Sequence, residues 1–228
     1  MVRELAERYP LARSFVLGAA AYLSGYLVTL AWLGNRITPI AEQVTADITY
    51  STTETTVATE PLLSSIIDQF GGISSTMWAG WLFTNAHFVP LSLGISGRGT
   101  TASIPNILLE AEGFSLMILF LIPPIALLLT GWLSGRVSRP SVGGMLPAGA
   151  NQGMMVALGY LPLTVAGALI FSISRPMEYS GIAPNLLMSV VVMGLIYPLV
   201  FGGIGGWLST KVYPASDSSG QEQAEFSS

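Results

Sequence analysis

The chain contains five apolar blocks that are each long enough to cross a lipid bilayer. They cover residues 14–33, 74–93, 113–133, 147–173 and 183–208. Twenty helical residues span about 30 Å, which is the thickness of the hydrocarbon core. Backbone groups find no water in lipid, so the blocks are predicted to be helices. The predicted fold is therefore an all-α, multi-pass membrane bundle of about five hydrophobic segments.

The low charge content supports this fold class. Charged residues make up 10% of the 228 residues and hydrophobic residues 51%, whereas a soluble domain carries about 25% charged residues. The chain lacks the charge to cover an ordinary water-facing surface. The lipid bilayer is its predicted environment, and the plasma membrane its predicted location.

The kinds of charged and sulfur-bearing residues exclude several classes of function. Acids outnumber bases by 13 to 9, and Lys211 is the single lysine. This acidic balance argues against a nucleic-acid partner, and a preference for arginine over lysine is typical of proteins from very salty habitats. The absence of cysteine excludes disulfides, thiolate nucleophiles and cysteine-based metal sites.

The apolar blocks divide the chain into six parts. A basic flank (residues 1–13) precedes the first membrane helix (14–33). A polar, acidic loop with a short surface helix is predicted at 34–73, where Pro61 and Gly71-Gly72 suit the start and end of that helix. Two helical hairpins follow at 74–133 and 146–208, and a disordered tail is predicted at 209–228.

The two hairpins contain related sequences, which indicates a tandem repeat. "LIPPIALLLTGWLSGRV" (121–137) resembles "IYPLVFGGIGGWLSTKV" (196–212), so that Pro123 matches Pro198 and Trp132 matches Trp207. "FVPLS" (88–92) likewise resembles "YLPLT" (160–164). Chance similarity between apolar helices is the alternative. A duplicated helix pair is a plan that some transporters use.

The distribution of basic residues leaves two topologies open. Five spans with the N-terminus inside place five bases inside and four outside; four spans, with block 74–93 only dipping into the membrane, place six inside and three outside. Five spans are preferred, because no base lies between Ile37 and Gly97. The acidic, Thr-rich residues 42–59 are then predicted to lie outside the cell.

His87, the one histidine, lies with Asn85 near the middle of block 74–93. An ionisable side chain inside a membrane is a candidate for function, because burying its charged form is costly. No Asp, Glu or Lys lies within the core of a block to complete a proton relay. A neutral His87 could instead hydrogen-bond to a neighbouring helix. A functional role and a packing role both stay open, and His87 is predicted to face other helices.

Further candidates are polar residues and helix breakers in the later blocks. Asn151 and Gln152 begin block 147–173 and could join a polar site or lie at the interface. Helix breaks that could line a substrate site or only kink the bundle are predicted at Pro123, Pro124, Pro162 and Pro198. Glycines spaced four residues apart, which allow helices to approach closely, are Gly131/Gly135, Gly149/Gly153 and Gly202/Gly206.

No sequence pattern for catalysis is found. Glu110 and Glu112 are two residues apart, so they point in different directions on a helix. "GISGRG" (94–99) lacks the Lys-Ser/Thr and the preceding strand of a phosphate loop. The chain is therefore predicted not to be an enzyme, and no cofactor or metal site is predicted.

Four motifs together resemble a family of short multi-pass membrane proteins of unknown function from haloarchaea. They are "GWLFTNAHFVPL", "LIPPIALLLTGW", "GYLPL" and "YPLVFGGIGG", within residues 15–208. The resemblance implies a membrane of a salt-loving archaeon. It implies no activity, cofactor or catalytic residue.

Two functions remain as hypotheses. The first is a membrane-embedded partner or accessory component that packs, through its glycine-rich helix faces, against another protein or a second copy. The second is a small transporter or channel-like protein with a site near His87 and the proline-broken helices. The first is preferred, because a solute path usually needs more polar groups inside the membrane.

Overall fold

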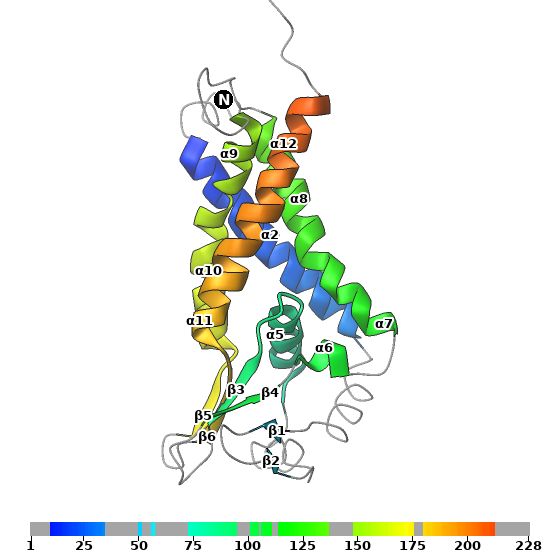
Figure 1. Cartoon of the computed structure of the whole chain (residues 1–228), viewed down its shortest axis with the longest axis vertical. Coiled ribbons are helices and arrows are strands. Elements are labelled where there is room, and N and C mark those ends of the chain that lie inside the picture. Colours follow the sequence, from blue (N-terminus) through cyan, green and yellow to red (C-terminus); the bar gives the residue numbers. More distant parts are fainter. Residues whose placement is uncertain are drawn as a thin grey trace, which may run out of the picture.

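Four long helices form the body of the molecule (Figure 1). The computed structural model describes residues 10–34, 50–51, 56–57, 73–94, 101–104, 106–110, 114–136, 148–175 and 180–212. Within them, four helices of 18 to 26 residues are long and apolar enough to cross a membrane: Leu11–Leu33, Ile118–Gly135, Gly149–Ile170 and Leu186–Lys211. The chain is thus a mostly helical membrane protein. The predicted count of about five spans is not confirmed.

Three of the four long helices are irregular. The exception is the first long helix, which is the single α-helix α2 (Pro10–Leu33). The second joins α7 (Phe114–Met117), a 3-10 segment (Ile118–Leu121) and α8 (Ile122–Gly135). The third joins α9 (Ala148–Met154) to α10 (Ala157–Ile170). The fourth begins with α11 (Leu186–Met188) and ends with α12 (Gly203–Val212). Between them lie two π-helical segments, Ser189–Ile196 and Pro198–Gly202.

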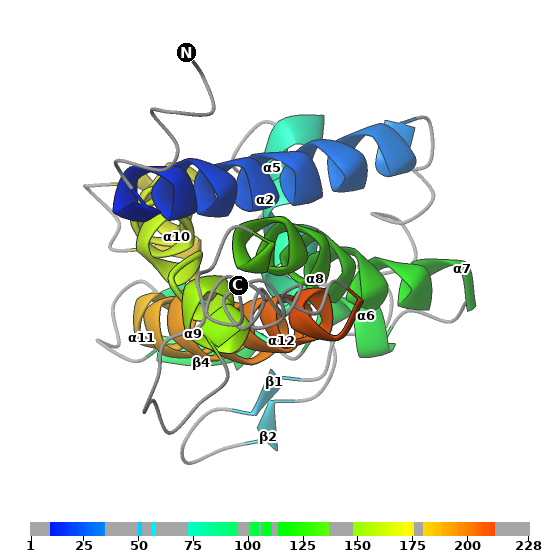
Figure 2. The same ribbon diagram turned by 90° about the horizontal axis from the view of Figure 1, so that it is seen from above.

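The helices pack with α8 at the centre, as Figure 2 shows from above. α8 contacts α2 on one side and α12 and α9 on the other, and α10 packs against α2. Helix α12 ends at Val212, so residues 209–212 of the predicted tail are helical, and the rest of that tail lies outside the described residues. The predicted surface helix after Pro61 lies outside the described residues.

A six-stranded antiparallel sheet lies at the end opposite the start of α2 and the end of α12 (Figure 1). Its strand order is β2-β1-β4-β3-β6-β5. The strands are β1 (Tyr50–Ser51), β2 (Thr56–Val57), β3 (Leu91–Gly94), β4 (Thr101–Ile104), β5 (Ile173–Arg175) and β6 (Ser180–Pro184). The prediction of an all-α fold is therefore wrong in this region.

Block 74–93 does not form the single long helix that the sequence predicts. Helix α5 spans Ser75–Asn85, and the Ser74 side chain caps its first turn by accepting a hydrogen bond from the Met77 amide. A turn follows in which Phe88 has φ of 60°. Pro90 has no amide hydrogen and disfavours a helical conformation at the residue before it. The chain therefore returns as strand β3, which starts at Leu91.

The turn after α5 reaches halfway along the four long helices. One apolar cluster joins Phe83 and Val89, on either side of this turn, to Tyr22, Tyr160 and Tyr197. These tyrosines lie near the midpoints of the spans at Leu11–Leu33, Gly149–Ile170 and Leu186–Lys211. The 11 residues of α5 rise about 16 Å, half the thickness of a hydrocarbon core. Helix α5 and strand β3 thus form a hairpin that reaches from the sheet end to the middle of the bundle, and it is called the re-entrant hairpin below.

The paired glycines bring helix backbones together inside the chain. A Cβ on Gly131 would lie 2.2 Å from the Gly202 carbonyl oxygen, and one on Gly153 would lie 2.1 Å from the same atom. A Cβ on Gly206 would lie 2.0 Å from the Gly149 carbonyl oxygen. These glycine faces of α8, α9 and the fourth long helix therefore pack against one another, and a partner protein would have to bind elsewhere.

The two proposed copies of the repeat agree in one helix and differ in the other. Gly131 lies opposite Gly202 and Gly135 opposite Gly206, so α8 and α12 run in the same direction. Trp132 and Trp207 accordingly lie toward the same end. The first helix of each pair differs, because α5 ends halfway along the bundle whereas α9 and α10 continue through it. The tandem repeat is not confirmed.

Candidate functional site

The turn of the re-entrant hairpin places His87 in a buried site between α5, α10 and the fourth long helix. Its Nδ1 atom lies 2.8 Å from the Phe83 carbonyl oxygen, and its Nε2 atom lies 2.7 Å from the Tyr160 hydroxyl. The side chain is 0% exposed. His87 thus links α5 to the middle of α10.

These two hydrogen bonds, together with the absence of a neighbouring carboxylate, fit a neutral His87. A carbonyl oxygen only accepts, so Nδ1 carries the proton and donates it to Phe83. A tyrosine hydroxyl can donate or accept, so Nε2 accepts from Tyr160 when the imidazole is neutral. No Asp or Glu belongs to the described parts of α2, α5, α10 and the fourth long helix, which surround it. The site therefore holds a neutral imidazole.

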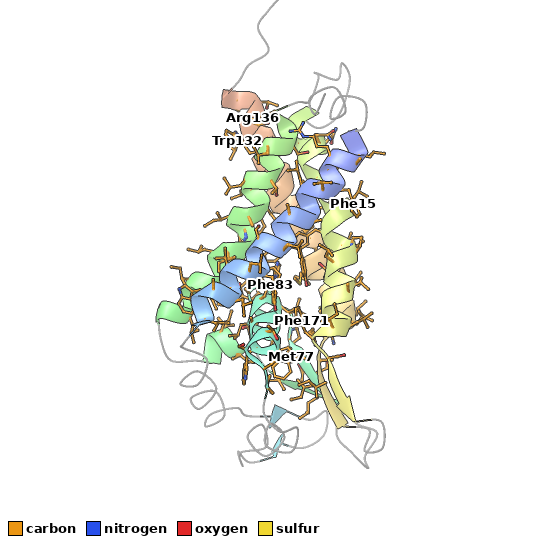
Figure 3. The ribbon with its side chains drawn as sticks, turned by 180° about the vertical axis from the view of Figure 1, so that it is seen from behind. Phe15, Met77, Phe83, Trp132, Arg136 and Phe171 are labelled. Atoms are coloured by element: carbon orange, nitrogen blue, oxygen red, sulfur yellow. The ribbon has the colours of Figure 1, made fainter. Side chains whose placement is uncertain are left out.

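Aromatic rings enclose the imidazole. The Phe83 ring is edge-on at 4.9 Å, and the Tyr197 and Tyr160 rings lie at 4.8 and 6.0 Å. Tyr22 contacts Phe83 and Tyr160 with ring centroids 5.3 Å away. Figure 3 shows Phe83 at the end of α5 next to α2. The environment is apolar, which disfavours the charged imidazolium.

Asn85 fixes the shape of the turn. Its Nδ2 donates to the Val89 carbonyl at 3.0 Å, and its Oδ1 accepts from the Ile107 amide at 2.7 Å. Asn106 donates to the Asn85 carbonyl at 2.7 Å, and the Tyr197 hydroxyl donates to the Ala86 carbonyl at 3.4 Å. The carbonyl groups at the end of α5 thus accept hydrogen bonds from donors within the chain. The role of Asn85 here is to stabilise the turn.

Gln152 and Asn151 lie away from His87. The Gln152 side chain donates to Ser14 Oγ at 2.9 Å, and Ser134 Oγ donates to the Gln152 carbonyl at 3.0 Å. Ser14 is near the start of α2 and Ser134 near the end of α8, so this cluster lies at the end opposite the sheet. Asn151 is exposed. The four predicted polar residues thus form two separate groups.

The chain matches the model of one protein family over nearly its whole length. The match covers residues 2–212. The chain belongs to the family of unknown function DUF7978. No curated protein and no solved structure matches the chain. The predicted membership of a family of unknown function is confirmed, and the haloarchaeal source stays a prediction.

The four predicted helix-break prolines of this DUF7978 member lie beside helix irregularities. Pro123 and Pro124 occupy the first turn of α8, directly after the 3-10 segment. Pro162 lies in the second turn of α10, which follows the break between α9 and α10. Pro198 begins the second π-helical segment. Widened or interrupted turns accommodate a residue that lacks an amide hydrogen.

Sequence reasoning missed the tyrosines around His87. Tyr22, Tyr160 and Tyr197 each lie near the middle of an apolar block, and that shared position is a signal the sequence contained. The Tyr22 hydroxyl and Ser189 Oγ are buried and have no hydrogen-bond partner among the described residues. Within the same residues, no group of three His, Asp or Glu side chains could hold a metal ion. The site can therefore donate and accept hydrogen bonds, and it holds no fixed charge.

Proposed function

We propose that this DUF7978 member is a non-catalytic component of the cell membrane that binds a transmembrane helix of a partner protein. The glycine faces are used inside the chain. The partner therefore binds at the re-entrant hairpin.

The observation that carries this proposal is the exposed turn at Phe88. Phe88 is 55% exposed, and its backbone is non-helical at a point halfway along the spanning helices. No described residue donates a hydrogen bond to the Phe88 carbonyl group. Non-helical backbone is tolerated at membrane depth only where protein covers it or where it lines a water-filled cavity.

The apolar surroundings of Phe88 favour a protein cover over water. The Phe88 ring stacks on Phe120 at 4.8 Å with an interplanar angle of 23°. Met117 and Leu121, on the same helix as Phe120, are 48% and 56% exposed. An apolar helix with a Ser, Thr or Asn side chain would cover these side chains and donate a hydrogen bond to the Phe88 carbonyl.

Photo-cross-linking from position 88 tests this proposal in native membranes. Benzoylphenylalanine at Phe88 is expected to give a discrete protein adduct, which mass spectrometry identifies and a reciprocal probe in the partner helix reproduces. A doubled mass from the purified, reconstituted chain would identify the partner as a second copy.

The matched control is benzoylphenylalanine at Leu23, which is 49% exposed near the midpoint of the regular helix α2. It is expected to label lipid. Lipid adducts alone from both positions would refute the partner function.

The re-entrant hairpin also supports a second candidate, a small transporter or channel-like protein. Half-length helices that end near the membrane midplane form substrate and ion sites in several transporter folds. Helix α5 has this arrangement, and Asn85 and His87 lie at its end. The occupied carbonyls at that end favour the partner function. In the transporter case, reconstituted protein would carry a proton or ion flux that depends on His87.

We further propose that the end of the bundle where residues 10 and 212 lie faces the cytoplasm. Four spans put six bases, Arg3, Arg8, Arg13, Arg136, Arg139 and Lys211, on that side and three on the other. This distribution follows the positive-inside rule. The sheet would then face outward.

Single-cysteine labelling tests the orientation directly, because the chain has no cysteine of its own. Ser172→Cys, at an exposed position beside the sheet, is expected to react in intact cells with a membrane-impermeant maleimide. Ser219→Cys, after the last helix, is expected to react only in inverted vesicles. The opposite pattern would reverse the orientation.

A further inference from the structure

The recurring segment Gly-Trp-Leu-Ser followed by a base has no role in the function proposed above. It occurs at 131–136, ending in Arg136, and at 206–211, ending in Lys211. The two segments belong to α8 and α12, which lie side by side and run in the same direction. Both therefore deliver a tryptophan and a base to one end of the molecule.

The two helix ends are held in contact at the level of these bases. A Cβ on Gly135 would lie 2.3 Å from Ser209 Oγ and 2.7 Å from the Gly206 carbonyl oxygen. Arg136 directly follows Gly135, and Lys211 comes two residues after Ser209. Both bases thus start within about one helical turn of this contact.

Each base lies over the tryptophan four residues before it. The Arg136 guanidinium carbon is 3.5 Å from the centroid of the Trp132 ring, and Lys211 Nζ is 5.9 Å from the Trp207 ring. Figure 3 shows Trp132 and Arg136 together at the end of α8. Trp207 is 42% exposed. Stacking restrains the two cations beside rings of the kind that gather at membrane interfaces.

A third base reaches the same end from α2. Arg13 donates a hydrogen bond to the Leu133 carbonyl, one turn before Arg136. The apolar spans end at Gly135 and Lys211, so these bases lie where lipid phosphates begin.

We propose that the paired ends of α8 and α12 bind the phosphate of an anionic lipid headgroup. Arg136 offers forked donors that match phosphate oxygens, and Lys211 offers a compact positive charge. Trp132 and Trp207 pack beside the upper acyl chains and the glycerol region. This site is independent of the partner surface at Phe88.

Lipid selectivity measured by electron paramagnetic resonance tests the proposal on the full-length protein. Spin-labelled phosphatidylglycerol is compared with spin-labelled phosphatidylcholine in reconstituted membranes. The unchanged protein is expected to prefer phosphatidylglycerol, and the double variant Arg136→Gln/Lys211→Gln is expected to lose about fivefold in relative association for each base removed.

The control variant is Arg175→Gln, which removes the same charge from strand β5 at the sheet end. It is expected to keep the preference. An equal loss in the control, or an unchanged preference in the double variant, would overturn the proposal. Circular dichroism confirms that each variant is folded before its selectivity is compared.

A competition arm distinguishes lipid from a free anion. Inorganic phosphate at millimolar concentration and constant ionic strength is expected to leave the lipid signal unchanged. Displacement of the spin-labelled phosphatidylglycerol would assign the site to a soluble anion and overturn the lipid assignment.

Discussion

Gly206→Ala is expected to destabilise the bundle by about 3 kcal/mol or more, the upper range for overpacking a close contact. The new methyl group would lie 2.0 Å from the Gly149 carbonyl oxygen and 3.0 Å from the Gly153 Cα. Both are backbone atoms of α9, so relief requires α9 and α12 to move apart. That movement would also open the contact between Gly153 and Gly202.

Gly203→Ala is the matched control on the same helix. A Cβ there meets the Cε and Cγ atoms of Met154 at 3.0 and 3.2 Å. Methionine is flexible and can move aside, so the expected loss is below about 1 kcal/mol. Denaturant unfolding of both variants in detergent measures the difference. Equal losses would contradict the close backbone contact at Gly206.

His87→Leu is expected to destabilise the fold by about 2–4 kcal/mol, because it leaves two buried polar groups without partners. The Phe83 carbonyl loses its donor and the Tyr160 hydroxyl loses its acceptor. His87→Gln can still donate and accept, and its expected loss is smaller. Tyr160→Phe removes one of the two bonds and is expected to lie between them.

The same variants separate a structural His87 from a functional one. Reconstituted wild-type protein and the His87→Gln variant are expected to show equal proton and ion flux, or none. A folded His87→Gln variant that loses a flux present in the wild type would establish the transporter function instead. A His87→Leu variant as stable as the wild type would contradict the hydrogen bonds assigned to the imidazole.

The membrane helices could be predicted because their signal is local and long. Apolar runs such as 14–33 and 183–208 are long enough to cross a bilayer whatever surrounds them. The close packing of glycines on α8, α9 and α12 also follows from a local pattern, their four-residue spacing. Which helix each glycine face would meet depended on the tertiary fold.

The re-entrant hairpin could not be predicted from hydropathy alone. Residues 74–93 are mostly apolar, but half of this block is helix and part is strand. The distinction depends on Pro90 and on the hydrogen bonds of Asn85 to Val89 and Ile107. The sheet could not be predicted either, because strands of two to five residues are too short to show an alternating hydrophobic pattern.

Part of the site was visible in the sequence and part was not. An intramembrane histidine is rare enough to identify His87 as a candidate. Its partners Phe83 and Tyr160 are ordinary aromatic residues, and Tyr160 is 73 positions away. Asn151 and Gln152 have the same polar character but lie at the other end, because the depth of a residue depends on where its helix starts.

The π-helical segments of the fourth helix bear on how the protein matches a bilayer. That helix has 26 residues, against 22 in its neighbour Gly149–Ile170, and as a regular α-helix it would be about 39 Å long in a hydrocarbon core of about 30 Å. A π-helix closes its hydrogen bonds over five residues, so its turns are wider and each residue advances the helix less. The eight residues of Ser189–Ile196 and the five of Pro198–Gly202 shorten the helix in this way. We therefore expect a smaller hydrophobic mismatch than a regular α-helix of the same 26 residues would have.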